Sequence, residues 1–299
     1  LQHDHLDYYG DMEHYFEAKK SLFTPAHSRC GVVCVDDEWG LRLAQESEVP
    51  VTTVSVFSHR EADWTVRRIN FDRAIPAVTF DLVTPQGDER LIRMPMLGEV
   101  NVQNAVVALV AALKLGCEFE AAVSALEGAE QIPGRMTSVN PDPGAQPLVI
   151  VDFAHTPEGL DWTLKSVREL TRGKLVLVFG TDGDRDATKR EPLAEIAAQL
   201  ADVLWVTDEN PRTEDASSIR QQLLNGIRRV RPDFHDVTEV TTCRRDAVRQ
   251  AILAADAGDI VVISGKGAEW YQDIQGIKHV YNDVPVAREV LEQDIRARL

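Results

Sequence analysis

The chain has 299 residues, of which 44% are hydrophobic and 27% are charged, as in a globular protein of about two domains. Its 48 acidic and 32 basic residues give a net charge of −16, so neither nucleic acid nor an anionic membrane is an expected partner. No apolar run reaches the roughly 18 residues of a membrane span, and the start lacks a secretion signal. Four scattered cysteines favour reduced thiols and a cytoplasmic location.

Residues 11–23, DMEHYFEAKKSLF, predict one amphipathic helix. Its apolar face is formed by five large side chains: Met12, Tyr15, Phe16, Leu22 and Phe23. The same spacing places Lys19, rather than Lys20, within that face. A buried amine tends to be neutral and reactive. The alternative is a lysine that lays its stem on the core and extends its ammonium to water.

Strands are predicted at residues 30–37, 51–57, 64–71, 77–83 and 90–97, followed by helices at 101–116 and 118–126. Residues 131–135, QIPGR, form a candidate linker. Apolar runs at 148–153, 174–179, 203–206 and 259–264 then alternate with helices that begin near Glu158, Pro192 and Asp215, with another near the C-terminus. This alternation predicts an α/β fold with a parallel sheet and right-handed crossovers.

Four polar segments follow these later strands: DFAHTPEG at 152–159, GTDGDRDATKR at 180–190, TDENPRTED at 207–215 and SGKGAEWYQ at 264–272. Turn chemistry alone explains one or two such segments. Because the carboxyl ends of parallel strands meet at one edge of a sheet, we expect all four segments to gather there around a shared cleft.

These segments, together with DHLDYYGDMEHYFEAKK at 4–20, NVQN at 101–104 and PGRM at 133–136, resemble the Mur ligases, in particular the diaminopimelate-adding branch. The resemblance implies the later part of the central ATP-binding domain at 1–133. It also implies a Rossmann-like, mostly parallel C-terminal amino-acid-binding domain at 134–299. The family's N-terminal domain and its P-loop, G-x-x-x-x-G-K-[ST], have no match in this sequence. We therefore expect part of a longer protein, inactive by itself in cleaving ATP.

The resemblance implies an ADP-forming ligase of peptidoglycan synthesis, and thereby a role in the cell wall, cell shape and cell division. ATP would phosphorylate the D-glutamate carboxylate of UDP-N-acetylmuramoyl-L-alanyl-D-glutamate, and an amine of meso-diaminopimelate would attack the acyl phosphate. Expected cofactors are ATP and Mg²⁺. The expected partners are the two substrates, with no nucleic acid and no membrane, and the expected state is a cytoplasmic monomer.

By the same resemblance, Lys19 becomes a carbamate that holds Mg²⁺ together with His5, in keeping with the preference of Mg²⁺ for oxygen ligands. Nucleotide contacts fall on five residues: Asn101, Asn104, Arg135, Asp152 and His155. Two of these have simpler alternatives. Asn101 is also suited to cap a helix, and Asp152 to accept bonds from amides in a turn.

For diaminopimelate, the resemblance assigns Arg185 and Arg212 to the distal carboxylate and Glu269 to the ammonium, because a zwitterion calls for both charges. Glu209, Asn210 and Gly265 complete the set. Within the family, the arginine at position 212 separates diaminopimelate users from lysine users. The alternative for ENPR is a proline turn with solvated charges.

The chain departs from the family pattern at six positions: Val100, Thr137, Asp182, Thr188, Glu209 and Ala268. Asp182 and Thr188 replace glycines and could crowd a tight loop. We interpret the chain as a divergent enzyme. Two alternatives stay open: a non-catalytic Mur-like binding subunit, and another amide ligase of the superfamily, of the lysine-adding, alanyl-alanine-adding or folylpolyglutamate type. A dehydrogenase is disfavoured because G-x-G-x-x-G is missing.

Overall fold

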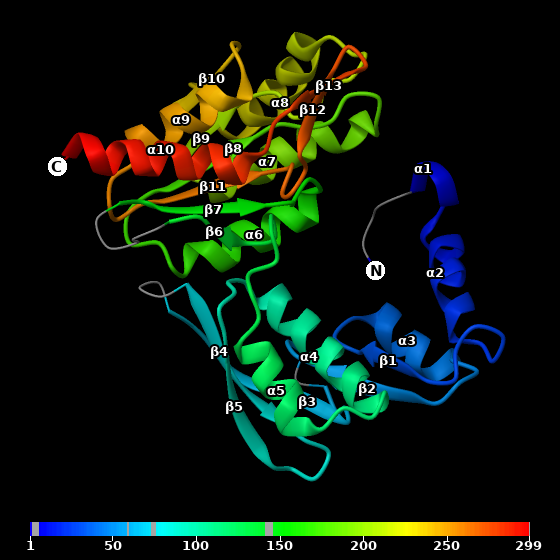
Figure 1. Cartoon of the computed structure of the whole chain (residues 1–299). Helices are drawn as coiled ribbons and strands as arrows, with labels where there is room; N and C mark the ends of the chain where they lie inside the picture. Colours follow the sequence, from blue (N-terminus) through cyan, green and yellow to red (C-terminus); the bar gives the residue numbers. More distant parts are fainter. Residues whose placement is uncertain (2–5, 59, 73–75, 141–145, 299) are drawn as a thin grey trace. The chain divides into compact units, whose positions relative to one another are not determined.

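The computed structural model describes residues 1, 6–58, 60–72, 76–140 and 146–298 (Figure 1). The chain divides into two compact units. Unit 1 takes the residues up to Glu130 except 73–75, and unit 2 runs from Gln131 to the C-terminus. Each unit has its own hydrophobic core. Within the described residues, no helix combines the length and the apolar character needed to cross a bilayer.

Unit 1 begins with short helices rather than with the single helix predicted for residues 11–23. After α1 (Leu6–Tyr9), α2 spans Met12–Lys20 and a 3₁₀ turn takes Ser21–Phe23. Asp11 caps α2 by accepting a hydrogen bond from the His14 amide at 2.9 Å. The prediction was wrong at the C-terminal end because the Ser21 hydroxyl donates to the Ala18 carbonyl, where the chain tightens.

The sheet of unit 1 has five strands in sequence order: β1 (Gly31–Cys34), β2 (Val51–Ser55), β3 (Trp64–Asp72), β4 (Ala77–Val83) and β5 (Glu89–Met94). The pairs β1–β2 and β2–β3 are parallel, and the remaining two pairs are antiparallel. Three helices accompany the sheet: α3 (Glu38–Glu46), α4 (Glu99–Lys114) and α5 (Phe119–Glu127). All five strands and two of these helices were predicted, whereas α3 was not.

One carboxylate, Asp36, joins the ends of β1 and β2. It accepts hydrogen bonds from the amides of Val56, Phe57 and Ser58 at 3.0–3.1 Å and from the hydroxyl of Ser55. Partial burial opposes its ionisation, but these donors, the Ser58 amide foremost, hold the pKa of Asp36 well below its usual range. The loop after β2 is therefore anchored by a charge-assisted network.

The main sheet of unit 2 has the order β10-β9-β8-β11-β7-β6. Its strands are β6 (Thr137–Ser138), β7 (Leu148–Asp152), β8 (Leu175–Phe179), β9 (Val203–Val206), β10 (Val237–Glu239) and β11 (Ile260–Ser264). Every pairing is parallel except that of β6 with β7. All residues of β7, β8 and β11 are buried, and their sequences are apolar except for Asp152 and Ser264 at the ends of β7 and β11. The predicted mostly parallel α/β sheet is confirmed.

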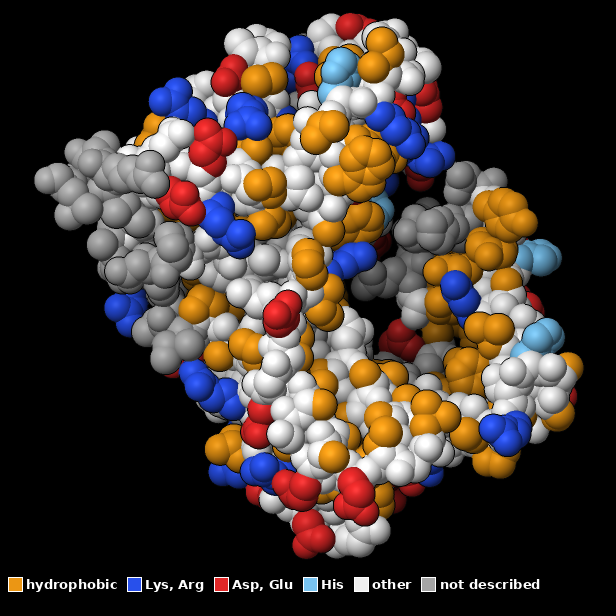
Figure 2. All heavy atoms as spheres, viewed as in Figure 1, with side chains coloured by type: hydrophobic (Ala, Val, Ile, Leu, Met, Phe, Trp, Pro, Cys, Tyr) orange, Lys and Arg blue, Asp and Glu red, His pale blue; other side chains and the backbone are white. Residues whose placement is uncertain are grey.

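Four helices of unit 2 follow its strands as predicted. One further helix and one β-hairpin were not predicted. The predicted helices are α6 (Pro157–Arg168), α7 (Arg190–Leu200), α8 (Ala216–Val230) and α10 (Asp283–Arg298). A 3₁₀ turn at Ala187–Lys189 precedes α7. Neither α9 (Arg244–Ala254) nor the hairpin of β12 (Tyr271–Ile274) and β13 (Ile277–Val280) was predicted. Figure 2 shows hydrophobic side chains gathered over this hairpin, where Trp270, Ile277 and Val280 are exposed.

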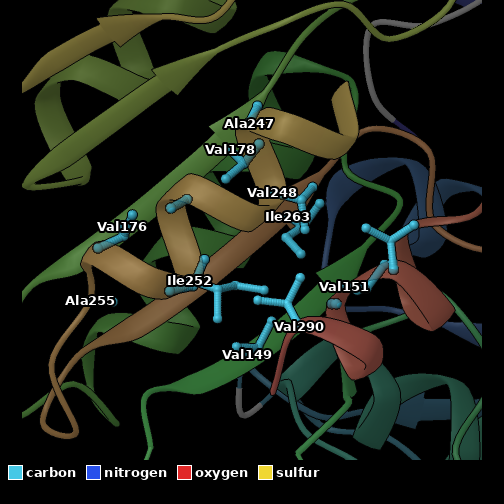
Figure 3. Packing of buried hydrophobic residues seen from close by; sticks show 14 of the residues in the cluster. Val149, Val151, Val176, Val178, Ala247, Val248, Ile252, Ala255, Ile263 and Val290 are labelled. Atoms are coloured by element: carbon cyan, nitrogen blue, oxygen red, sulfur yellow. The ribbon is translucent and has the colours of Figure 1, made fainter. Parts of the chain in front are cut away.

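A hydrophobic layer joins α9 and α10 to the sheet of unit 2 (Figure 3). The strands contribute β-branched side chains to it: Val149, Val151, Val176, Val178 and Ile263. The helices contribute Ala247, Val248, Ile252 and Val290, which are all 6% exposed or less. Burying such side chains supplies the main stabilisation of this unit, and it fixes the strand ends that carry the polar loops.

Beneath the loop after β11 lies a fully buried ion pair. Arg244 donates to both carboxylate oxygens of Asp283 at 2.9 Å and to the Ser264 carbonyl at 2.8 Å. The Tyr281 hydroxyl donates to the same carboxylate at 2.8 Å. This arrangement ties the first turns of α9 and α10 to the end of β11.

Replacement of Arg244 tests this pair. Arg244→Met leaves the Asp283 charge buried without its partner, so we expect a loss of about 3–5 kcal/mol in the free energy of unfolding. The neighbouring Arg245 pairs with Glu289 in solvent, so Arg245→Met, the matched control, is expected to cost less than about 1 kcal/mol. Urea unfolding of both variants measures the difference. Equal losses would contradict a structural role for the buried pair.

Candidate functional site

The polar loops of unit 2 meet at the carboxyl edge of its sheet. The Gly265 amide donates to the Asp152 carbonyl at 3.2 Å, and the Ser264 hydroxyl donates to the Ala154 carbonyl. These bonds join the loops after β7 and β11, while Asn210 joins those after β8, β9 and β11 as described below. The prediction that the four segments gather at one edge is thus confirmed (Figure 1).

Asn210 lies at the centre of this edge and is 1% exposed. Its Nδ2 donates to Asp182 Oδ1 at 2.9 Å and to Glu269 Oε2 at 3.0 Å. Its Oδ1 accepts from Lys266 Nζ at 2.8 Å and from the Asp273 amide at 3.1 Å. A side-chain amide has two donor hydrogens and two acceptor lone pairs, so these four bonds use its full capacity. Asn210 therefore positions the loops.

Lys266 brings a positive charge into the interior of the site. It is 0% exposed, and its Nζ lies 2.7 Å from Glu269 Oε2 in addition to its bond with Asn210. The Glu269 side chain remains 29% exposed. The Glu269 carboxylate thus faces solvent, while Asn210 and Lys266 fix its position from the buried side. The sequence analysis assigned no role to Lys266, although it stands in the same GKGAE segment.

Arg212 is held in a backbone conformation with φ +52°. Its amide donates to the Asp273 carbonyl at 3.0 Å, and its carbonyl accepts from the Gln275 amide at 2.6 Å, so the β12–β13 hairpin fixes it. A positive φ is unfavourable for a residue with a side chain and persists where the surroundings impose it. The guanidinium of Arg212 is 25% exposed and pairs with Asp182, with Nη2 3.2 Å from Oδ2.

Asp182 is the partner of Arg212 that sequence reasoning missed. Its carbonyl accepts from Arg190 Nη2 at 3.0 Å, and Arg190, fully buried, binds both oxygens of Glu214 at 2.8–2.9 Å. Asp182 does not crowd the loop. The tight position belongs to the next residue, Gly183, whose added Cβ would lie 2.0 Å from the Pro211 carbonyl oxygen. An acid directly after a strand end was the signal available in the sequence.

Glu209 is a buried carboxyl group beside the same loops. Burial first, and the nearby Asp182 charge second, raise the pKa of Glu209 to about 8. Within the described residues, its Oε2 has no hydrogen-bond partner. Gly265, with φ +113°, leaves room for it, since a Cβ there would meet Glu209 Oε2 at 2.5 Å. At neutral pH we therefore expect Glu209 to carry a proton.

Arg185 does not join this cluster. Its side chain is exposed on the loop after β8, beside Asp184. Hydrogen bonds from Thr213 are the main cause that lowers the pKa of Asp184, and the charges of Arg212 and Arg185 add smaller effects. Of the two arginines predicted to bind a carboxylate, the structure brings Arg212 together with Asn210 and Glu269 and leaves Arg185 at the surface.

Three predicted nucleotide contacts, Arg135, Asp152 and His155, lie close together in unit 2. The Arg135 guanidinium stacks 4.2 Å from the ring centroid of Phe153, and the His155 ring meets the same ring edge-on at 4.7 Å. Asp152 accepts from the Met136 amide at 2.9 Å, the Ala154 amide at 3.0 Å and the Thr163 hydroxyl at 2.9 Å. The bond from Ala154 is the one that the turn alternative for Asp152 predicted, and the other two come from residues farther along the chain.

The two asparagines of NVQN lie in unit 1 and differ in environment. Asn101 is buried and donates to the Leu97 carbonyl at 2.7 Å, whereas Asn104 is exposed. Asn101 is not the helix cap, because α4 begins after Gly98, whose φ of +89° suits glycine. Between them, Gln103 donates to Asp36 at 3.2 Å and to Cys34 at 3.0 Å, a contact that the sequence analysis missed.

Lys19 does not point into a core, so that prediction was wrong. Its side chain is exposed, with Nζ 5.4 Å from the centre of the Tyr15 ring. Lys20 is the more buried of the two and pairs with Glu17 and Glu46. The helix ends at Lys20, so the helical spacing that was used to place Leu22 on the apolar face does not extend to that residue. Leu22 is exposed. His5 lies outside the described residues.

The described residues contain no group of three or more His, Cys, Asp or Glu side chains arranged to hold a metal ion. With Lys19 exposed, the predicted Mg²⁺ site rests on the family resemblance alone.

Replacing Glu209 tests its protonation. Between about pH 5 and 8, folded Glu209 keeps a proton that an unfolded glutamate, with a pKa of about 4.3, releases. Rising pH therefore lowers the free energy of unfolding, and the effect ends above the folded pKa. Glu209→Gln removes this dependence, so between pH 5 and 8 its free energy of unfolding should rise by more than about 1 kcal/mol relative to that of the wild type. Urea unfolding at several pH values measures it, with the exposed Glu169→Gln as control. Parallel curves for wild type and Glu209→Gln would refute the raised pKa.

Comparison with known families gives two matches along the chain. The Mur ligase middle domain matches residues 1–112, and the glutamate ligase domain of Mur ligases matches residues 134–267. The candidate site in unit 2 lies largely within the second match, which ends at Gly267, two residues before Glu269.

Individual relatives agree with these matches. The UDP-N-acetylmuramyl-tripeptide synthetase of Leifsonia xyli is 41% identical over 297 residues. The UDP-N-acetylmuramoyl-L-alanyl-D-glutamate–2,6-diaminopimelate ligase of Streptomyces coelicolor is 37% identical over 293 residues. Each alignment covers 98% of this chain and 57% of the relative, so the chain spans little more than half the length of these relatives.

A solved structure of a UDP-N-acetylmuramoyl-L-alanyl-D-glutamate–2,6-diaminopimelate ligase is 34% identical. It matches 99% of this chain and 59% of its own length, with a TM-score of 0.62. The predicted resemblance is confirmed by both family matches and by these relatives: the chain belongs to the Mur ligase family.

Proposed function

We propose that the whole protein is an ATP-dependent amide ligase that adds meso-diaminopimelate to the D-glutamate of UDP-N-acetylmuramoyl-L-alanyl-D-glutamate, in the cytoplasm. In this proposal, residues 1–133 belong to its central domain and residues 134–299 form the domain that binds the amino acid. Similarity to the named relatives supports the reaction. One observation in this chain supports the amino-acid site: Asn210 holds Glu269 directly and Arg212 through Asp182.

The charges of this cluster suit a zwitterion. Arg212 offers a partly exposed guanidinium to a carboxylate, and Glu269 offers a partly exposed carboxylate to an ammonium. Glu269 is held by the buried side chains of Asn210 and Lys266, and Arg212 is held by Asp182, so little side-chain freedom is lost when a ligand binds. Asn210, whose four hydrogen bonds are internal, acts in the proposal by positioning Glu269 and Asp182. Glu209 and Gly265 are neighbours of these groups. Arg185, which is exposed on the loop after β8, has a peripheral role in the proposal.

The chemistry of such a ligase needs positioning more than a covalent catalyst. The D-glutamate carboxylate attacks the terminal phosphorus of ATP, and ADP leaves. The amine nitrogen then forms a bond to the acyl carbon, inorganic phosphate departs with the electron pair of the broken C–O bond, and the nitrogen loses a proton. Arg135, Asp152 and His155, gathered around Phe153, are the proposed nucleotide contacts in unit 2, and Asn101 and Asn104 are those in unit 1.

Dependence on ATP is a property of the family. Mg²⁺ would neutralise phosphate charge when bound. This sequence contains no G-x-x-x-x-G-K-[ST] motif, so the proposal assigns the triphosphate-binding loop to a part of the protein outside these residues. Carbamylation of Lys19 keeps only the support of the resemblance, because the burial that motivated it is not found.

A second candidate is an amide ligase for a diamino acid that lacks a distal carboxylate, as a lysine-adding enzyme would use. One observation favours it: Arg212 already has a carboxylate partner, Asp182, within unit 2.

Calorimetric titration of this chain tests the amino-acid site. We expect meso-diaminopimelate to bind the wild type and Arg212→Ala to weaken that binding at least about tenfold, because a charged hydrogen bond to the ligand is lost. Arg249→Ala, which removes an exposed arginine of α9, is the control and should bind as the wild type does. Equal affinities of the wild type and Arg212→Ala for diaminopimelate would refute the assignment of Arg212.

A further inference from the structure

Asp182 binds the guanidinium of Arg212 with its carboxylate, the group that the proposed function assigns to the ligand. Its Oδ2 lies 3.2 Å from Arg212 Nη2, while its Oδ1 accepts from Asn210 Nδ2 at 2.9 Å. This carboxylate therefore bridges the recognition arginine and the central asparagine of the site. A bridge of this kind gives the Arg212 guanidinium a charged partner at Nη2 when no ligand is bound, whereas its Nε has no hydrogen-bond partner within the described residues.

The main chain around Asp182 is locked. Arg190, fully buried, donates to the Asp182 carbonyl at 3.0 Å, and the following Gly183 amide donates to the Asn210 carbonyl at 2.8 Å. A Cβ at Gly183 would overlap the Pro211 carbonyl, so the two loops are in close contact. The Asp182 side chain can change rotamer, but its backbone cannot move away without breaking these contacts.

How strongly a site rejects a ligand that lacks a carboxylate depends on the hydrogen bonds that the site's own groups then lose. A site built to pair a carboxylate rejects an analogue without one, because its own buried donor is then left unpaired. Here that loss is small, since Asp182 keeps Arg212 paired. A ligand carboxylate, in turn, must displace Asp182 or lie beside it, where two negative charges repel.

We propose that Asp182 is a specificity-determining residue, an internal counter-ion of Arg212 that lets the site accept diamino acids with and without a distal carboxylate. The proposal rests on the proposed function of this site as the diamino-acid site of a ligase. It deepens that function by naming a residue that sets the preference between diamino acids with and without the distal carboxylate.

The balance of charge around the site agrees with this class. Arg212 pairs with Asp182 and also lies near the charge of Asp273, and Lys266 pairs with Glu269. With Glu209 protonated, three negative charges oppose two positive ones. An added ammonium brings the site to neutrality, whereas an added ammonium and carboxylate together leave the imbalance unchanged.

The test compares two ligands on a series of variants. Calorimetry measures the dissociation constants of meso-diaminopimelate and of L-lysine for the wild type, Asp182→Asn and Asp182→Gly. Asparagine keeps an oxygen for Asn210 and removes the charge, so the loop should stay in place. Asp186→Asn, which removes an exposed charge from the same loop and keeps an oxygen for Thr188, is the matched control. Circular dichroism verifies that each variant is folded.

We expect the wild type to bind the two ligands within about tenfold of each other. Asp182→Asn should shift their affinity ratio at least about tenfold towards diaminopimelate, because the competing charge is removed and Arg212 then needs the ligand carboxylate. Asp186→Asn should leave the ratio within about threefold. In an Arg212→Ala background, Asp182→Asn should have no effect on the ratio, since the two residues act as one pair.

The outcomes separate this proposal from the proposed function. If diaminopimelate binds and Asp182→Asn and Asp182→Gly leave the ligand ratio unchanged, the role of Asp182 is refuted and the diamino-acid site stands. A shift that persists without Arg212 likewise refutes the counter-ion mechanism. If no folded variant binds either ligand, the diamino-acid site itself is refuted, and the inference fails with it.

Discussion

The candidate site depends on one side-chain amide. Asn210 makes four hydrogen bonds, and through them it holds residues from the loops after β8 and β11 and from the β12–β13 hairpin. In a buried position, each of these bonds satisfies a polar group that would otherwise be costly to remove from water. The partly exposed charges of Glu269 and Arg212 are consequently presented at fixed positions, although both stand on irregular segments.

Two ion pairs, each with a fully buried arginine, support this arrangement. Arg244 with Asp283 fixes the end of β11 to α9 and α10, and Arg190 with Glu214 fixes the loop after β8. Buried pairs contribute little net stability compared with apolar replacements, but removing one partner is costly. Their place beside the polar loops agrees with a role in positioning. The apolar strands beneath supply the stability that carries the functional residues.

The sequence was informative where one short-range pattern decides the structure. Continuous apolar runs predicted β7, β8 and β11, and the polar segments after them predicted where the site gathers. It was uninformative where contacts between residues far apart in the sequence decide the structure. Lys19 was placed by helical spacing, but α2 ends one residue later and leaves Lys19 exposed. The pairing of Asp182 with Arg212 joins residues thirty positions apart, and no local pattern reports it.

The central role of Asn210 can be tested directly by hydrogen–deuterium exchange of Asn210→Asp, which keeps the acceptor oxygen and loses both donor hydrogens. The loss should speed exchange at residues 180–186, 207–213 and 265–275 together, while β8 stays protected. Asn225→Asp, in α8, serves as the control and should leave all three segments unchanged. Faster exchange confined to residues 207–213, or none at all, would contradict the claim that this one amide holds the three segments together.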